Sequence, residues 1–271
     1  MNRILGVLVV LMVFGASAQD STGIRLVEKS VLPLDSAAYW NMDAIGNHLV
    51  SANGTITKID TAGDLRFAQS VKAFGETSAI VSINTFKLIH FSEEQQTICY
   101  LDNSLTLYEG SFELSDRDII NGTLVSASSQ SNKVWVLDQL NSTLYLLEMM
   151  NRQAPREITN LNGLLDFNTV IQIKEAGNKL YMLTSEGIFV LDIYGSLIEV
   201  IRQENISYFD ANESYLYTLQ ANKLNIRNTQ TGAETSIPLP VLGVFQLKVV
   251  NGALFARTPK NVHKFELQML D

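Results

Sequence analysis

The chain has 271 residues, of which 46% are hydrophobic and only 18% are charged, a composition that predicts a large folded core and excludes a disordered chain. Its formal net charge is −8, and no run of basic residues occurs. Because nucleic acids and anionic membranes are bound mainly through clusters of Lys and Arg, this balance excludes nucleic acid as a partner and disfavours an anionic membrane. The single cysteine excludes an intrachain disulfide.

The first 18 residues have the pattern of a secretory signal peptide. Arg3 provides the positive start, residues 4–14 are apolar, and residues 16–18 form an A-x-A cleavage site. The apolar run is too short to span a bilayer comfortably. We therefore expect an exported bacterial protein, either periplasmic, associated with the cell surface or secreted. Its residues 19–271 should form a single domain without an integral membrane segment.

After the signal peptide, the first expected strand covers residues 25–34 and has no hairpin partner beside it in the sequence. The first full unit follows, with strands expected at 48–52, 55–60 and 64–71. Its first two strands are joined by Asn53-Gly54, a pair typical of tight β-hairpins. This unit provides the template for the rest of the chain.

Five further units with the same layout follow in order. Their expected strands are 86–91, 97–102 and 104–110; 133–138, 142–150 and 156–161; three within 179–201; 214–220, 223–228 and 234–239; and finally 252–258 and 262–270. A repeat of about 40–50 residues with three or four strands is typical of a β-propeller blade. The last unit is one strand short.

A further short apolar segment precedes each unit and is the expected innermost strand of a blade. These segments are 42–45, 79–83, 123–126, 170–173, 206–209 and 244–249. A large β-sandwich is the alternative, since it also has many short strands, but the regular period favours the propeller. The strand at 25–34 would complete the last unit. We predict an all-β, six-bladed β-propeller closed by its N-terminal strand, which also removes exposed sheet edges.

Two units carry a resemblance to a known repeat. LYMLTSEGIFVLDIYG at 180–195 and KVWVLDQLNSTLYLL at 133–147 resemble the NHL/YVTN-type propeller repeat, in which an apolar strand is followed by a loop, I-x-V-hydrophobic-D and a Gly turn. The resemblance covers residues 25–271 and implies a fold; it implies no chemistry.

Few residues suggest a reaction. Cys99 lies in a strand-like run and is expected to be a buried, inert thiol, and His48, His90 and His263 occupy different places in their units, so they share no metal-binding position. We expect no cofactor and no metal site. Asp43 and Asp210 adjoin inner strands, where a propeller hydrolase or lyase would place channel-facing carboxylates or a metal.

Aromatic residues recur just before or within the expected inner strands. They are Tyr39, Trp40, Phe167, Tyr208 and Phe245. Loops entering inner strands converge on one mouth of the channel, where such rings would bind a peptide, a glycan or another envelope protein. The alternative is that the rings pack between blades.

The sequence therefore favours a binding or scaffold module of the bacterial cell envelope, a monomer that works within a complex. Whether it is also an enzyme stays open, and the alternative function is a propeller hydrolase or lyase with a channel-facing site.

Overall fold

The structure is a computed structural model of the chain that describes residues 24–34, 39–149 and 153–269. The expected signal peptide, residues 1–18, lies outside the described residues. Within those ranges the regular structure consists of β-strands and three short 3-10 helices, η1 (Lys72–Phe74), η2 (Leu114–Arg117) and η3 (Phe167–Thr169). No helix in this part of the chain is long and apolar enough to cross a membrane.

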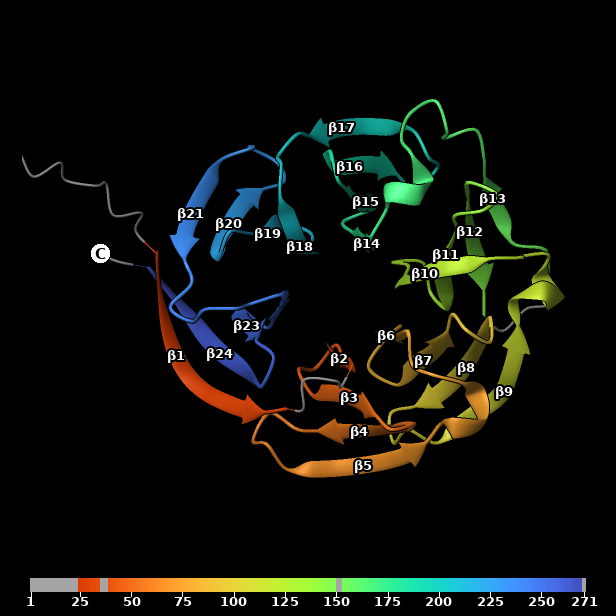
Figure 1. Cartoon of the computed structure of the whole chain (residues 1–271), viewed down its shortest axis with the longest axis horizontal. Helices are drawn as coiled ribbons and strands as arrows, with labels where there is room; N and C mark the ends of the chain where they lie inside the picture. Colours follow the sequence, from red (N-terminus) through yellow and green to blue (C-terminus); the bar gives the residue numbers. More distant parts are fainter. Residues whose placement is uncertain (1–23, 35–38, 150–152, 270–271) are drawn as a thin grey trace, which may run out of the picture.

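Six four-stranded antiparallel sheets form a ring around a central opening (Figure 1). From inner to outer strand, the first blade consists of β2 (Tyr39–Met42), β3 (His48–Ala52), β4 (Thr55–Ile59) and β5 (Leu65–Ser70). The second blade consists of β6 (Ala79–Ser82), β7 (Lys87–Ser92), β8 (Thr97–Asp102) and β9 (Leu107–Glu113). The third blade consists of β10 (Gly122–Ala127), β11 (Lys133–Asp138), β12 (Thr143–Glu148) and β13 (Arg156–Ile158). The fourth and fifth are β14 (Gln172–Ala176), β15 (Lys179–Thr184), β16 (Gly187–Asp192), β17 (Leu197–Ile201); β18 (Ile206–Ala211), β19 (Tyr215–Gln220), β20 (Lys223–Asn228), β21 (Glu234–Pro238). The predicted six-bladed β-propeller is confirmed.

The sixth blade contains both ends of the described chain. It is built from β22 (Gln246–Val250), β23 (Ala253–Arg257), β24 (Asn261–Met269) and, outermost, β1 (Ile24–Pro33). β1 runs antiparallel to β24, with Ile24 opposite Met269 and Pro33 opposite Asn261. The N-terminal strand therefore closes the ring, as the missing strand of the last unit predicted.

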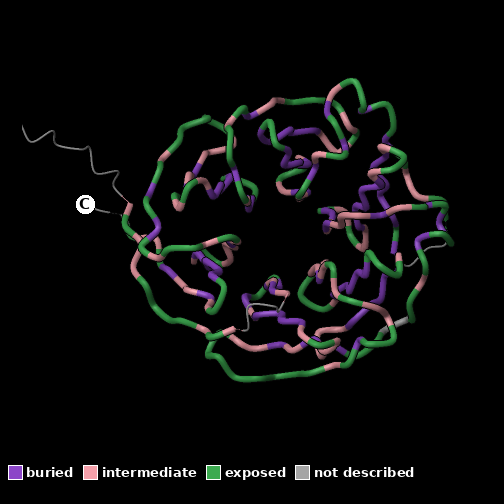
Figure 2. The backbone as a smooth tube through the Cα atoms, viewed as in Figure 1, coloured by how far each residue is buried: buried purple, intermediate pink, exposed green. Residues whose placement is uncertain are grey.

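The core is divided among the interfaces between neighbouring blades. Six apolar clusters are present, and each joins two adjacent blades. Trp40, Met42 and Val50 of the first blade pack with Phe255 and Val262 of the sixth, for example. In the second blade, β7 and β8 are covered on both faces and are almost entirely buried, whereas the outer strand β5 of the first blade is largely exposed (Figure 2). This burial explains why the middle strands have continuous apolar sequences rather than alternating ones.

The tight turns have the chemistry that the sequence indicates. Asn53 and Gly54 adopt positive φ values of 52° and 71°, as a two-residue hairpin turn requires. Gly187 has φ +129°, and a Cβ atom there would lie 2.2 Å from the carbonyl oxygen of Ile201, so only glycine fits. Asp192 Oδ1 accepts hydrogen bonds from the backbone N–H groups of two residues in the turn that follows, each at 2.8 Å. Asp192 therefore stabilises a turn at the blade edge.

Two of the predicted inner strands are shifted. The prediction at 42–45 was wrong, because β2 begins at Tyr39 and the chain turns after Met42. Asp43 Oδ1 accepts from the N–H groups of Ile45 at 3.1 Å and Asn47 at 2.8 Å, which defines that turn. The prediction at 170–173 overlaps only the start of β14. Both inner strands contain polar side chains that face the channel, so a search for apolar runs misplaced them.

Candidate functional site

A channel runs along the axis of the ring, with a cavity volume of about 490 Å³ lined by the inner strands of all six blades. One lining side chain from each inner strand lies on the strand face that is turned toward the next blade along the chain. We call these six residues the channel ring: Asn41, Val81, Ser126, Lys174, Asp210 and Lys248. Their chemistry determines what the channel can hold.

Most polar groups of the channel ring connect adjacent blades. Asn41 Nδ2 donates to the carbonyl oxygen of Ile80 at 2.6 Å. The ammonium of Lys174 donates to Asp210 Oδ1 in an ion pair between the fourth and fifth blades. The other oxygen of Asp210 accepts from the N–H of Val249 in the sixth blade at 2.7 Å. These groups hold the inner strands together and are already occupied.

Lys248 differs from these residues. Its ammonium makes no hydrogen bond and no ion pair with any part of the chain that the structure describes. Burial alone would lower the pKa of Lys248, but attraction by Tyr208, Asp210 and Tyr39 outweighs it and raises the pKa. Burial would raise the pKa of Asp210, yet Lys174 and Lys248 hold it below its usual value. Two lysine charges therefore lie near one carboxylate, which forms an ion pair with Lys174 alone among the described residues.

The five aromatic residues expected at the channel mouth are divided between the wall and the core. Tyr39 and Tyr208 line the channel, and Phe245 is exposed at the start of the sixth blade. Trp40 and Phe167 are each only 1% exposed and pack between blades. The expectation of an aromatic binding surface stays a prediction for the three rings that reach solvent.

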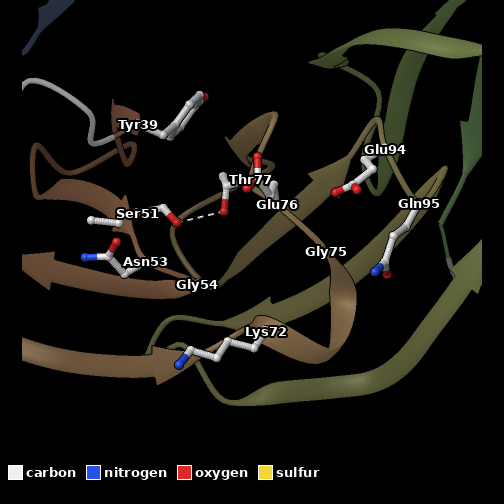
Figure 3. Close-up of a pocket in the computed structure, with 11 residues that line it drawn as sticks. Tyr39, Ser51, Asn53, Gly54, Lys72, Gly75, Glu76, Thr77, Glu94 and Gln95 are labelled. Atoms are coloured by element: carbon white, nitrogen blue, oxygen red, sulfur yellow. Dashed lines mark hydrogen bonds between the residues drawn. The ribbon is translucent and has the colours of Figure 1, made fainter.

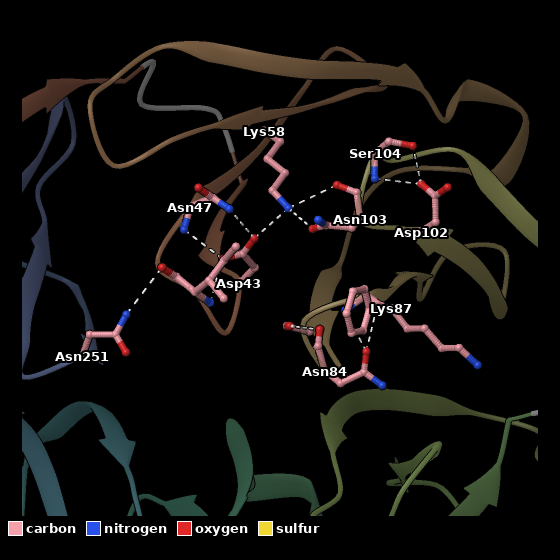
Figure 4. Close-up of polar contacts among 12 residues, drawn as sticks. Asp43, Asn47, Lys58, Asn84, Lys87, Asp102, Asn103, Ser104 and Asn251 are labelled. Carbon is pink, nitrogen blue, oxygen red and sulfur yellow. Dashed lines mark hydrogen bonds and ion pairs between the residues drawn. The ribbon is translucent and has the colours of Figure 1, made fainter.

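The two carboxylates expected to face the channel both do so, and each is paired with a lysine. Asp43 and Lys58 form an ion pair of 2.8 Å in which both side chains are 3% exposed (Figure 4). Burial would raise the pKa of Asp43, but bonds from Lys58 and Asn47 lower it. Asp210 is paired with Lys174. Among the described residues, no group of three or more His, Cys, Asp or Glu is arranged to hold a metal ion.

A second hollow, of about 550 Å³, lies between the first and second blades (Figure 3). Ser51 Oγ lies 2.7 Å from Thr77 Oγ1, which is 3.0 Å from His90 Nε2. Burial lowers the pKa of His90 to about 4, so the ring is neutral at pH 7. Its Nδ1 is buried and has no partner among the described residues. No sequence pattern predicts this chain of hydrogen bonds, because its members come from two different repeat units.

Cys99 and the other histidines have structural environments. Cys99 is a buried free thiol, as expected, and burial raises its pKa to about 12, which disfavours the reactive thiolate. His48 Nδ1 accepts from Trp40 Nε1 at 3.1 Å. His263 Nδ1 lies 2.6 Å from a carboxylate oxygen of Glu28, across the ring closure. The three histidines therefore take part in separate contacts.

Apolar side chains are exposed on both faces of the ring, and three of them lie in adjoining segments of one face. This face, called here the loop face, carries the loops that lead from an outer strand to the next inner strand and the turns between second and third strands. Ile120, Leu140 and Ile171 lie in such segments of the third and fourth blades and are 68%, 70% and 60% exposed. Ile171 also lines the channel.

Hydrogen bonds hold these three segments side by side. The N–H of Asn121 donates to Asp138 Oδ2 at 3.2 Å, which joins the loop before β10 to the end of β11. Gln139 Nε2 donates to the carbonyl oxygens of Phe167 and Val170, each at 3.0 Å. Ile120, Leu140 and Ile171 are each adjacent in sequence to one of these bonded residues. The three exposed side chains therefore come from adjoining segments of the loop face, and we refer to them together as the apolar patch.

No protein-family model and no curated protein matches the sequence. Solved structures match the fold. Virginiamycin B lyase from Staphylococcus aureus is 12% identical over 85% of this chain and 80% of its own, with a TM-score of 0.59. The Neurospora crassa Pan2 WD40 domain is 8% identical over 92% and 98%, with a TM-score of 0.63. PorZ, described as an essential surface component of the Porphyromonas gingivalis type-IX secretion system, is 10% identical over 92% of this chain and 39% of its own, with a TM-score of 0.51. Identities this low establish the propeller fold alone.

Proposed function

We propose that this chain is an exported propeller of the bacterial cell envelope that binds a protein partner on its loop face. The observation that carries the proposal is the apolar patch of Ile120, Leu140 and Ile171. Monomeric soluble proteins rarely expose large contiguous apolar patches, and such patches mark interaction sites. Phe245 lies on the same face, and Tyr39 and Tyr208 lie in the channel that opens beside it.

The envelope location is supported by two independent observations. Residues 1–18 have the three parts of a signal peptide. The fold is also shared with PorZ, which is described as a bacterial surface component. A rigid ring that holds a partner on one face suits a monomer that works within a larger assembly.

The test is affinity capture from an envelope extract with matched variants. One variant carries Ile120→Ser, Leu140→Ser and Ile171→Ser. The control variant carries three equivalent changes on the opposite face, at Ile45, Phe86 and Tyr194, which are also exposed. We expect a partner that the wild type and the control retain and that the loop-face variant loses. Capture of the same proteins by all three chains would reject the proposed surface.

A propeller hydrolase or lyase is the second candidate, and the hollow between the first two blades favours it. His90 Nε2, in a neutral ring, can accept the proton of Thr77, which is the contact that activates a hydroxyl nucleophile. A pKa near 4 makes His90 a weak base, so this candidate ranks second. Hydrolysis of p-nitrophenyl acetate that is lost in Thr77→Val would support it, and equal rates in both proteins would dismiss it.

A further inference from the structure

The wall of the axial channel is charged on one side and uncharged on the other. The polar side comes from the inner strands of the fourth, fifth and sixth blades and carries Lys174, Asp210 and Lys248. The uncharged side comes from those of the second and third blades and carries Ala79, Val81 and Leu124, together with the hydroxyls of Ser82 and Ser126. A cavity of this kind suits a ligand that is itself charged at one end and apolar at the other.

The polar side has one group that the fold does not use. Asp210 bonds both the ammonium of Lys174 and the N–H of Val249, so these groups satisfy one another. Lys248 is half-buried on the channel wall, and no described residue lies within hydrogen-bond or ion-pair distance of its ammonium. A half-buried cation without a contact partner loses part of its hydration, and an anion from outside the chain would offset that loss.

Other channel ions do not cancel this charge. Asp43, toward one end of the channel, is already paired with Lys58. Glu175 lies on the opposite face of β14 from Lys174, and its oxygens accept bonds from Ser128 and from Trp135. Those donors are neutral, so Glu175 keeps its negative charge on that other face of β14, and the positive charge of Lys248 is a local property of its own part of the wall, where a ligand with a single negative charge fits.

We propose that the axial channel binds a carboxylate whose charged group pairs with Lys248 and whose apolar body packs against Ala79, Val81 and Leu124. The phenol of Tyr208 lies in the same cavity, accepts a hydrogen bond from Gln246 Nε2 at 3.3 Å, and can donate its own proton to the second carboxylate oxygen. A volume of about 490 Å³ is that of a small-molecule site. The ligand is a free apolar carboxylic acid or the C-terminal residue of a peptide.

The experiment measures binding of N-acetyl-leucine to the full mature chain by calorimetry. N-acetyl-leucinamide, which has the same shape without the charge, is the matched probe. We expect the acid to bind at least about 10-fold more tightly than the amide, because a hydrogen bond to a charged group contributes about 1.5–3 kcal/mol. Equal affinities, or no binding of the acid at 10 mM (about the weakest affinity worth a functional claim), would overturn the proposal.

Variants locate the site and separate it from the loop-face proposal. Lys248→Met should weaken binding of the acid about 10-fold, whereas Lys223→Met, the same change at an exposed lysine of β20, should leave it within about twofold. If Lys248→Met fails to fold, the comparison of acid with amide on the unchanged protein still decides. The Ile120→Ser and Leu140→Ser changes should leave acid binding intact, so partner capture and acid binding can fail independently.

A tripeptide ending in leucine distinguishes the two sources of the carboxylate. Tighter binding of the tripeptide than of N-acetyl-leucine would identify a peptide C-terminus as the ligand; the reverse order would identify the free acid.

Discussion

The buried ion pair between Asp43 and Lys58 is expected to be a major contributor to the stability of the first two blades. Lys58 lies on β4, and its ammonium contacts both the carboxylate of Asp43 and the carbonyl oxygen of Asn103 at 3.2 Å in the second blade. Lys58→Met keeps the length of the side chain and removes the charge. The carboxylate of Asp43 is then left buried without a cation (Figure 4).

The size of the destabilisation depends on how many hydrogen bonds the carboxylate of Asp43 keeps in the variant. Breaking a buried pair on one side costs about 3–5 kcal/mol. Asp43 keeps bonds from the N–H of Ile45 and from both the backbone and the side chain of Asn47, so the lower end of that range applies. We therefore expect a loss of about 3 kcal/mol, which corresponds to a fall in Tm of about 6–12 °C for a chain of this size. Asp43→Asn combined with Lys58→Met should cost less than the sum of the two single changes.

The assay is equilibrium unfolding in urea at pH 7, with Arg66→Met as the control. Arg66 pairs with Asp60 at 2.7 Å in the same blade, but the arginine side chain is 58% exposed, so its removal should cost less than about 1 kcal/mol. Equal losses in the two variants would refute the reasoning.

The pKa of Asp43 is lowered by folding, so the contribution of Asp43 to stability is present at neutral pH and is lost as the pH falls below 3.8 through the folded pKa. The stability difference between wild type and Asp43→Asn should shrink over that range.

Three further predictions concern the ends of the chain and the thiol. Deletion of β1 (Ile24–Pro33) should abolish the single cooperative unfolding transition, because the sixth blade loses its outer strand. A chain that begins at residue 24 is the control. Unchanged melting of the deletion variant would show that cooperative unfolding does not require ring closure. Cys99 should react with Ellman's reagent at pH 8 only after unfolding in urea, since burial raises its pKa to about 12; rapid labelling of the native protein would contradict its inert environment. Protein isolated from the envelope should begin at Gln19 by N-terminal sequencing, and an intact Met1 would argue against cleavage.

The middle strands of the blades were predictable because their environment is simple. They are covered on both faces by neighbouring blades, so each is a continuous apolar run bounded by turn residues, as in β15 and β16. Ring closure was also predictable, since one unit lacks an outer strand and a lone strand stands at the other end of the chain. Inner strands were harder, because one face borders the channel. β14 alternates Gln172 and Lys174 with buried Ile173, which no search for apolar runs places correctly.

The candidate sites were harder to predict than the fold, because the residues that form them lie far apart in the sequence. Lys58 and Asn103 belong to different repeat units, as do Ser51 and Thr77, so their contacts exist only after the blades assemble. The apolar patch depends on exposure, and Ile120 and Leu140 cannot be distinguished by sequence from the buried isoleucines and leucines nearby. Trp40 shows the opposite problem, because a residue type common in binding sites serves here to pack two blades.

The channel of this propeller also changes how polar residues on inner strands should be interpreted. Asn41, Gln172 and Asp210 all face the axis, and each bonds the backbone of the next blade. Six sheets that meet around an axis must be held together there without a shared hydrophobic core, and side-chain bonds to the neighbouring backbone meet that need. A polar inner strand is therefore expected from the architecture and does not by itself indicate a ligand. A polar residue is informative when it makes no contact that holds the blades together. Among the residues that the structure describes, Lys248 is such a residue, and it therefore indicates a binding site more strongly than the paired carboxylates beside it.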